Sequence, residues 1–442
     1  MLSPLTDRTY RHLFSAQLLS LLGTGLLTVA LGLLAYDLAG ADAGAVLGTA
    51  LAIKMIAYVS VAPVAGAFVA FVPRRSLLVA LDLVRAAIAL LLPLVSEVWH
   101  IYVLIGLLQS CSAAFTPTFQ ATIPDVLADE AEYTRALSLS RLAYDLEALT
   151  SPLLAAALLT VMGFHWLFIG TVAGFVASAW LVLSVRLPSP TPPATAEGAW
   201  ARTTRGARIY LATPRLRGLL ALNLAVAAAG AMVIVNTVVI VRADYGLGNR
   251  ELALTLAAYG FGSMLTALIL PRVLDHVADR HVMLSGAVLL IGGRAAGAML
   301  AGMGWAAVLA IWFILGIGNG LVLTPSGRLL RRSAQPGDRP SLFAAQFALS
   351  HACWLVTYPM AGWLGGSIGS VATFAVLAAV TALGTVLAAL LWPRADTTEV
   401  EHTHTALDPA HPHLAHAEKL PGEGYRHRHA LVIDELHRRW PA

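Results

Sequence analysis

The strongest constraint on this chain is a series of apolar segments of about 18 residues or more. A helix rises about 1.5 Å per residue, so about 20 apolar residues cross the hydrocarbon core of a bilayer. The residues are 58% hydrophobic and 12% charged, whereas a soluble domain is about 45–50% apolar and about 25% charged. We therefore predict an all-α integral membrane protein embedded in the lipid bilayer. Twelve transmembrane helices are expected, at 13–36, 46–71, 76–96, 101–122, 137–161, 164–185, 218–241, 252–271, 282–302, 304–325, 342–365 and 370–392.

Arginine residues in the connections between spans predict the orientation of the chain. They precede the first span and follow the second, sixth, eighth, tenth and twelfth, whereas the alternate connections have none apart from Arg242 and Arg250. Cytoplasmic loops are enriched in lysine and arginine. We therefore place the spans in the cytoplasmic (inner) membrane of a bacterium, with both termini in the cytoplasm. The net charge of +4 reflects this asymmetry, and without a recognition motif it does not indicate nucleic-acid binding.

The connection after the sixth span divides the chain into two halves. It opens with the proline-rich PSPTPPATAEG and continues as AWARTTRGARIYLATPRLRG, which could form an amphipathic helix. We expect a six-helix bundle at 1–187, a cytoplasmic linker at 188–216, a second six-helix bundle at 217–394 and a tail at 395–442. Thr-Pro at 116–117 recurs at 324–325, and the prolines at 152 and 359 follow at matching distances. Parallel six-helix repeats are the architecture of major facilitator transporters.

One stretch also carries a family resemblance. FTPTFQATIPDVLADEAEYTRALSLSRLAYDLEALTSPLLAAALLTV resembles the exporter branch of the major facilitator superfamily that includes enterobactin exporters. More narrowly it is similar to nickel-resistance exporters of the NreB type, as are LATPRLRGLLALNLAVAAAGAMVIVNTVV and HALVIDELHRRWP. The resemblance covers nearly the full chain. It implies a major facilitator fold and proton-driven export of nickel, with cobalt or another divalent metal as further substrates.

The loop after the second span departs from that family. The family's loop usually reads G-x-x-x-D-R-x-x-R-R, and here Gly66, Arg74 and Arg75 remain while Ala70 and Phe71 replace the acid and the first base. In the family that acid helps to latch the outward-open state through a charge pair. A gating role is therefore expected for the retained glycine and arginines. Two charged residues on the third span, Asp82 and Arg85, are candidates for a substitute latch. A degraded copy in the second half, PRVLDHVADRH, retains acids at 275 and 279 and a base at 280.

Ionisable residues inside spans are costly and are functional candidates by default. We predict transport or proton-coupling roles for residues in three spans, namely Lys54, Arg141, Asp145, Glu147 and Arg294. Arg141 and Asp145 are four residues apart and can pair on one helix face. Either they neutralise each other as an internal ion pair, or Asp145 or Glu147 exchanges protons or contacts the cation. Lys54 would repel a cation unless it is paired with an acid or deprotonated by burial.

Other polar residues are expected to line a cavity between the halves. Superposing the repeats places Tyr144 opposite His351, whose neutral imidazole suits nickel, copper or zinc, although a structural hydrogen bond is an equal alternative. Asn223, Asn236 and Gln109 would add oxygen ligands or, more simply, hydrogen bonds between helices. The sequence contains no P-loop and no catalytic constellation, so we expect no enzyme activity and an ion gradient as the energy source. The cysteines, at 111 and 353, have no zinc-type spacing.

The C-terminal tail is rich in histidine. The residues are His402, His404, His411, His413, His416, His427, His429 and His437. Three pairs follow the pattern His-x-His, and alternate residues of an extended chain project to the same side. Neutral imidazoles at cytosolic pH favour nickel, copper and zinc. The tail is therefore a predicted metal site, with solvated histidines as the alternative. Its last segment, ALVIDELHRRW, is expected to dock on the transporter as a short helix.

Two interpretations of function follow, with a third of another class. The leading one is a monomeric exporter of Ni²⁺ or a similar divalent cation in exchange for protons, without a tightly bound cofactor. The tail would capture the metal or sense it. The alternative is an exporter of an organic compound, a drug or siderophore, with a regulatory metal-binding tail. A metal-sensing membrane receptor is disfavoured, because the sequence contains no recognisable signalling domain.

Overall fold

The computed structural model describes residues 2–39, 43–188, 198–297, 299, 304–394, 399–404, 414, 418–419, 424–430, 432–433, 437 and 440. Helices of the N-terminal half are α1 (Arg8–Ala39), α2 (Ala43–Phe68), α3 (Arg74–Leu91), α4 (Val98–Val126), α5 (Glu130–Leu159) and α6 (His165–Leu183). Those of the C-terminal half are α8 (Pro214–Val239), α9 (Asn249–Leu274), α10 (Asp279–Gly297), α11 (Trp305–Leu323), α12 (Ser326–Arg332) and α13 (Arg339–Leu391). The linker helix α7 spans Ala199–Ala212.

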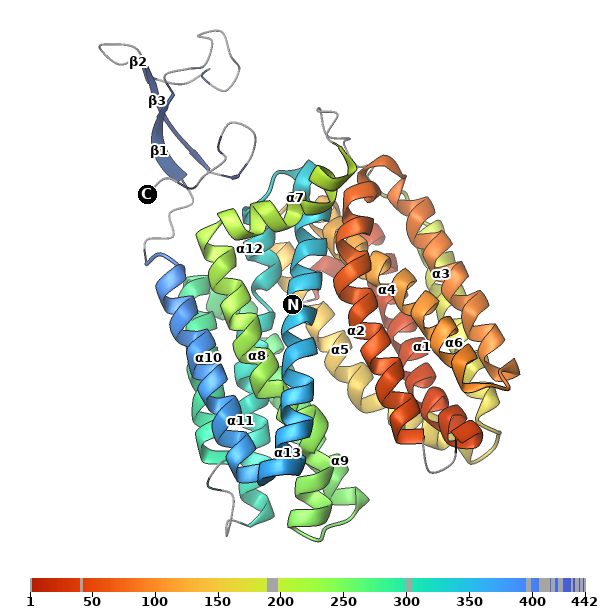
Figure 1. Cartoon of the computed structure of the whole chain (residues 1–442). Helices are drawn as coiled ribbons and strands as arrows, with labels where there is room; N and C mark the ends of the chain where they lie inside the picture. The colour runs from red at the N-terminus through yellow and green to blue at the C-terminus, as the bar shows by residue number, and fades with distance from the viewer. Residues whose placement is uncertain are drawn as a thin grey trace.

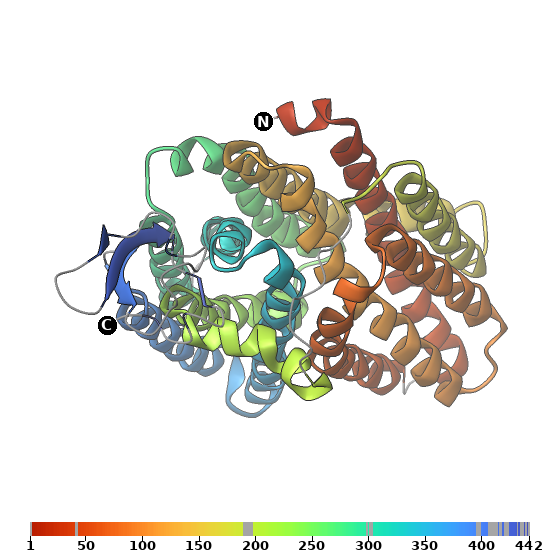
Figure 2. The ribbon, with the colours of Figure 1, turned by 90° about the horizontal axis from the view of Figure 1, so that it is seen from above.

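The helices form two six-helix groups that stand side by side, with α7 lying across one end (Figures 1 and 2). α13 contains two spans, because Gly369 has a φ of 81° that only glycine adopts readily and that breaks the helix. With that division the described helices account for the twelve expected spans, and the predicted fold class is confirmed. Short 3₁₀ or π turns flank them: η1 (Ser3–Thr6), η3 (Val69–Phe71), η4 (Leu92–Leu94), η5 (Ile240–Asp244) and η6 (Pro336–Asp338).

Nine described segments are long and apolar enough to cross a membrane by length and composition alone. They do not include three of the expected spans, 137–161, 282–302 and 342–365. These three carry charged or polar residues, among them Asp145, Arg294 and His351. Their polar content lowers their hydropathy, and ionisable residues inside spans are functional candidates by default.

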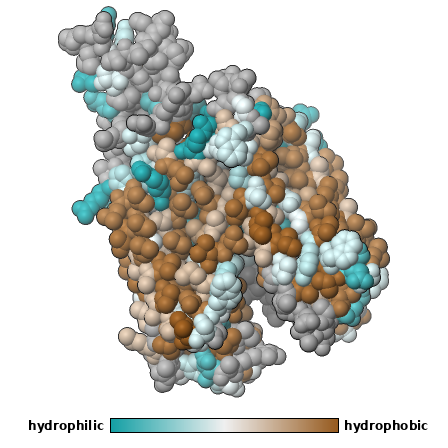
Figure 3. Space-filling model, viewed as in Figure 1, coloured by the Kyte–Doolittle hydropathy of each residue, from teal (hydrophilic) through white to brown (hydrophobic). Residues whose placement is uncertain are grey.

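Apolar side chains cover much of the outer face of the bundle that Figure 3 shows. Leu94 and Leu390 are 78% and 76% exposed although both belong to long apolar segments. Such exposure would be unfavourable in water, but it is expected where a helix faces lipid. Each half nevertheless has its own interior core, around Phe168 in the N-terminal half and around Trp312 in the C-terminal half.

The tail carries three short strands in the order β1-β3-β2: β1 (Glu399–His404), β2 (Glu418–Lys419) and β3 (Tyr425–Ala430). The sequence predicted a short docking helix after residue 429. Instead Ala430 ends β3, and Ile433 and Trp440, which are described without helical structure, pack against the core of the C-terminal half. The docking was anticipated, whereas the helix was not found in the described residues.

We call the end of the bundle that carries α7 the linker end, and the opposite end the far end. α2 and α4 finish at the linker end, and α3, α5, α10 and α13 begin there. The N-terminus also lies at this end, because Ser3 donates a hydrogen bond to Glu132 near the start of α5. The tail lies there too, because the Trp440 ring stacks on Arg215 at the start of α8.

Candidate functional site

Two pairs of helices bring the halves together: α2 packs against α13, and α5 packs against α9. Asp129 precedes α5, and its carboxylate caps the helix by accepting from the Glu132 amide. From that fixed start, the helix carries its polar residues about three to five turns into the bundle. The candidate residues of α2, α5 and α13 therefore lie at middle depth along the contact between the halves.

Arg141 on α5 joins the halves at this depth. Its Nη2 lies 3.0 Å from Asp145 Oδ1, and its Nε donates a 2.9 Å hydrogen bond to Ser263 Oγ on α9. Asp145 is 8% exposed, so the pair is largely shielded from solvent. The structure thus contains the predicted pair of Arg141 and Asp145. It also shows that this pair is bonded to the opposite half, which the sequence did not indicate.

A second pair of charges lies within the N-terminal half. Lys54 on α2 is within electrostatic reach of Glu147 on α5, and its Nζ lies 5.5 Å from the centroid of the Tyr58 ring. A Cβ added to Gly25 of α1 would meet both Glu147 and Ser151. A glycine at position 25 therefore leaves room for the Glu147 carboxylate. The positive charge of Lys54 accordingly has an acidic neighbour.

His351 on α13 faces Tyr58 across the contact between the halves. The two rings meet edge to face with centroids 4.8 Å apart, and the Tyr58 hydroxyl donates a 3.0 Å hydrogen bond to Gln109 Oε1. His351 Nδ1 lies 2.7 Å from the carbonyl oxygen of Phe347. A carbonyl only accepts, so Nδ1 carries the proton and Nε2 keeps its lone pair. The imidazole is therefore fixed in the tautomer that ligates a metal through Nε2.

Tyr58 is also a neighbour of Tyr144, the residue expected opposite His351. The remaining cavity candidates make contacts inside the C-terminal half. Asn236 donates to the Ala361 carbonyl at 2.9 Å, and Asn223 donates to Gln346 at 3.4 Å. Arg294 is fully buried, donates to the Ala228 carbonyl at 2.5 Å and lies over the Phe374 ring. The contacts of the two asparagines match the simpler interpretation, hydrogen bonding between helices, whereas the coupling role of Arg294 stays a prediction.

The two halves are joined at the linker end by a cluster around Asp125, at the end of α4. Arg74 Nη1 lies 2.5 Å from one carboxylate oxygen, and Arg339 Nη1 lies 2.5 Å from the other. Arg74 belongs to the N-terminal half and Arg339 to the C-terminal half. We call Arg74, Asp125 and Arg339 the Asp125 cluster. Asp125, which also belongs to the N-terminal half, thus links the halves through Arg339 and is held on its own side by Arg74.

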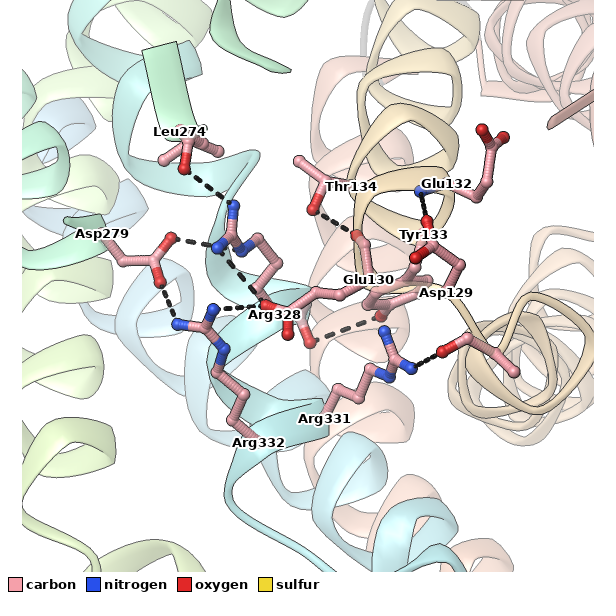
Figure 4. Close-up of polar contacts among 12 residues, drawn as sticks. Asp129, Glu130, Glu132, Tyr133, Thr134, Leu274, Asp279, Arg328, Arg331 and Arg332 are labelled. Carbon is pink, nitrogen blue, oxygen red and sulfur yellow. Dashed lines mark hydrogen bonds and ion pairs between the residues drawn. The ribbon is translucent and has the colours of Figure 1, made fainter. Parts of the chain in front are cut away.

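Glu130 at the start of α5 forms a second connection (Figure 4). Its Oε1 lies 2.5 Å from Arg332 Nη2 and 3.3 Å from Arg328 Nη2, both on α12. Arg332 also contacts Asp279 at 3.0 Å, and Arg331 donates to the Ala128 carbonyl. We call Glu130, Asp279, Arg328 and Arg332 the Glu130 cluster. The acid retained in the second loop copy, Asp279, therefore orients arginines that contact the N-terminal half.

The loop after α2 contributes part of what was expected. Gly66 packs against the start of α13, where an added Cβ would lie 2.5 Å from Ala344 Cβ and 3.2 Å from the Pro340 carbonyl oxygen. Its carbonyl accepts a 3.2 Å hydrogen bond from Ser341. Arg74 enters the Asp125 cluster, but Arg75 donates to the Leu183 carbonyl within its own half.

The residues expected to form a substitute latch make their contacts within the N-terminal half in this conformation. Asp82 and Arg85 are both buried inside the N-terminal half and pair with each other. Ser178 on α6 donates to Asp82 at 2.7 Å, and the Arg85 guanidinium lies over the rings of Phe115 and Phe175. Their position on α3 points them toward α6 and α4, away from α13. Asp125, three turns of chain beyond Phe115 and at the tip of α4, takes the bridging position instead.

These contacts close the linker end, whereas the halves part toward the far end. The hydrogen bonds and ion pairs described above run from the linker end to middle depth, where Arg141 meets Ser263. Figure 3 shows a notch between the two lobes at the far end. The middle-depth residues thus lie between a closed end and a parted end. That arrangement suits a path whose access alternates between the two sides.

The tail places four of its histidines at positions on one face of a strand ladder, two of them directly opposite each other. In the antiparallel β1–β3 ladder, His402 is paired with His427, and His404 and His429 lie two residues away on β1 and β3. Alternate and directly opposite positions share one face of a ladder. His437 is buried, and His411, His413 and His416 lie outside the described residues. Within the described part, no group of three histidine, cysteine or acidic side chains forms a metal site.

Sequence reasoning missed the residues that link the halves. Asp125, Glu130 and Arg339 stand at span ends, where charges ordinarily mark topology, and Tyr58 and Ser263 are unremarkable in sequence. Asp125 and Arg339 are 214 positions apart. The available signal was the acid at the end of the fourth span, in TIPDVLADE, opposite the arginine-rich segment after the tenth.

Comparison with known proteins completes this description. The Major Facilitator Superfamily profile matches residues 13–238 and 219–431. An uncharacterised MFS-type transporter of Bacillus subtilis (strain 168), YfiS, is 27% identical over 288 residues, which cover 62% of this chain and 67% of that protein. The human organic anion transporter MFSD10 (TETRAN) has a similar structure, with a TM-score of 0.73, 14% identity and coverage of 86% and 99% of the two chains. A bacterial homologue of the iron transporter ferroportin, outward-facing with soaked iron, has a TM-score of 0.70, 14% identity and coverage of 86% and 98%.

Proposed function

Because this chain belongs to the major facilitator superfamily of membrane transporters, we propose that it exports nickel, or a similar divalent cation, from the bacterial cytoplasm in exchange for protons. The linker end would face the cytoplasm, which makes the structure outward-facing. The tail would bind the metal on the cytoplasmic side, and the metal would then pass between the halves. Alternating closure of the two ends would move it across the membrane.

The observation that carries this proposal is the register of the β1–β3 ladder. It puts the positions of His402, His404, His427 and His429 on one face at the linker end. Directly opposite residues in an antiparallel pair have Cβ atoms about 5 Å apart. Imidazole-rich sites favour nickel, copper and zinc over magnesium, calcium and manganese. A tail with this histidine pattern is expected in a transporter that carries one of these metals.

The middle of the membrane supports the same proposal through His351. Its free Nε2 and the nearby Tyr58 and Gln109 oxygens offer ligands for one borderline cation. A site of so few strong ligands would bind loosely, and a transported ion must be released. Glu147 and Asp145 supply the negative charge that a dication needs during passage.

A second candidate function has an observation in its favour. At middle depth Lys54 and Arg141 balance Glu147 and Asp145, and Arg294 adds a further buried cation in the C-terminal half. Such a balance suits an organic substrate with an acidic group better than it suits a bare dication. In that case the tail would serve regulation alone.

Metal tolerance tests the leading proposal directly. We expect a nickel-sensitive host that expresses this chain to grow at several-fold higher nickel and to hold less cell-associated nickel, because export lowers the cytosolic concentration. Growth curves and elemental analysis of washed cells measure both. Normal nickel accumulation combined with resistance to an organic toxin would replace this proposal with the second candidate.

Removing the ladder histidines should weaken that resistance without abolishing it. Changing all four to alanine leaves Ile433 and Trp440 in place, so docking of the tail is kept. We expect roughly a two- to fivefold loss of tolerance, because the tail only supplies metal to the path. His351→Ala should lose nearly all of it. Complete loss in the ladder variant, or unchanged tolerance in His351→Ala, would contradict this division of roles.

A further inference from the structure

We propose that the linker helix α7 is a strap that holds the linker ends of the two halves together in the outward-facing state. α7 connects the halves in sequence, and it also contacts both in space, α13 on one side and α2 on the other. Figure 2 shows it running across the linker end from the C-terminal half toward the end of α2. This inference concerns the conformational equilibrium and holds whichever substrate is carried.

The C-terminal part of α7 is built into the C-terminal half. Ile209 and Tyr210 are buried in the core of that half, and the Tyr210 hydroxyl donates a 2.5 Å hydrogen bond to Gln346 on α13. Burial raises the pKa of Tyr210 well above its usual value, so this hydroxyl stays protonated as the donor. Gln346 is five residues before His351. One end of α7 therefore moves with α13.

The middle of α7 is fixed to the same half. Arg205 meets Asp338 through two contacts, of 2.6 Å from Nε and 3.2 Å from Nη2. Gly206 lies against the backbone of Ser341, and a Cβ there would run into its carbonyl group. A bidentate arginine and a close backbone approach define the position of α7 on α13.

The N-terminal part of α7 reaches the other half through Arg202. Its guanidinium carbon lies 5.1 Å from the centroid of the Phe68 ring and 5.0 Å from that of Phe71. A cation between two aromatic faces is attracted to both. Phe68 ends α2, and Phe71 occupies the loop position where the sequence pattern has a base. The aromatic residue that breaks the pattern thus receives an arginine from the linker.

These contacts give α7 a mechanical consequence. Opening the linker end requires the end of α2 to separate from the start of α13, where Gly66 now touches Ala344. Because α7 is fixed to α13, Arg202 must then leave Phe68 and Phe71. The strap therefore adds to the free energy of opening and is released once the halves part.

Distances between spin labels at Ser184, which follows α6, and Arg272 on α9 test this without any substrate. Both residues are exposed at the linker end, one in each half, and Cys111 and Cys353 are first replaced by serine. We expect Arg202→Ala to raise the ratio of open to closed linker end roughly three- to tenfold. Phe71→Ala should have a similar effect, and the two together should exceed either alone only slightly, because they remove one shared contact.

Trp200→Ala is the matched control, because Trp200 is on the same helix and is 80% exposed. It should leave the distance distribution unchanged. An unchanged distribution in Arg202→Ala, an equal opening in Trp200→Ala, or fully additive effects of Arg202→Ala and Phe71→Ala would each overturn the strap. If the chain did not raise nickel tolerance, the distances expected for these variants would be unchanged. The two proposals are therefore tested separately.

Discussion

Replacing Asp125 by asparagine is expected to open the linker end. The amide keeps the shape of the side chain but removes the charge that holds Arg74 and Arg339, so the two arginines of opposite halves are left close together. Breaking a shielded pair costs about 3–5 kcal/mol when fully buried. Because Asp125 is 14% exposed, we expect about 2 kcal/mol, which is roughly a 30-fold rise in the ratio of inward-open to outward-open molecules.

The same spin-label pair measures this shift, and transport should fall with it because the outward-facing state is depleted. Glu132→Gln provides the matched control. Glu132 also pairs with an arginine at 2.5 Å, but that partner is Arg135, one turn away on the same helix. The control should change neither the distances nor the rate. Equal responses of Asp125→Asn and Glu132→Gln would show that the shift follows from the loss of any negative charge at the linker end, and not from breaking a link between the halves.

The fold could be predicted because its determinants are local in sequence. Each span is read from its own residues, and the arginine asymmetry needs only the loops beside them. The prolines at matching positions of the two halves, such as Pro117 and Pro325, indicate that the halves repeat each other. The strands of the tail escaped prediction, because its composition is dominated by alanine, proline and charge, which do not favour strands. What the tail packs on, through Ile433 and Trp440, depends on a surface made by distant segments.

The site was predictable only in part, for a related reason. Arg141 and Asp145 were paired correctly because i,i+4 geometry is local to one helix. The hydrogen bond from Arg141 to Ser263 could not be predicted in the same way, because it depends on how the two halves pack against each other. Asp82 and Arg85 are a local pair too, and sequence alone does not distinguish a pair turned inward, toward Ser178, from one turned toward α13. The residues that join the halves are set by contacts more than a hundred positions apart, as between Arg141 and Ser263 and between Asp125 and Arg339.

Neutralising Glu147 should separate transport from the proton gradient. Glu147 faces Lys54 beside Ser151, whereas Asp145 is committed to Arg141. Because Arg141 holds the Asp145 carboxylate, we assign the proton exchange to Glu147. An imposed pH gradient should speed transport into vesicles by the unchanged protein. We therefore expect this gain in rate to be at least tenfold smaller in Glu147→Gln. The gradient-free exchange of substrate should remain.

Asp145→Asn is the comparison that makes this result interpretable. It leaves the Arg141 charge unbalanced beside Ser263, so the rate should fall with and without the gradient alike. The ratio of the two rates should then stay near that of the unchanged protein. If the gradient instead ceased to speed transport in Asp145→Asn and still did so in Glu147→Gln, the proton site would be Asp145. Unchanged rates in both variants would remove both carboxylates from the coupling mechanism, and Lys54 or His351 would be the next groups to examine.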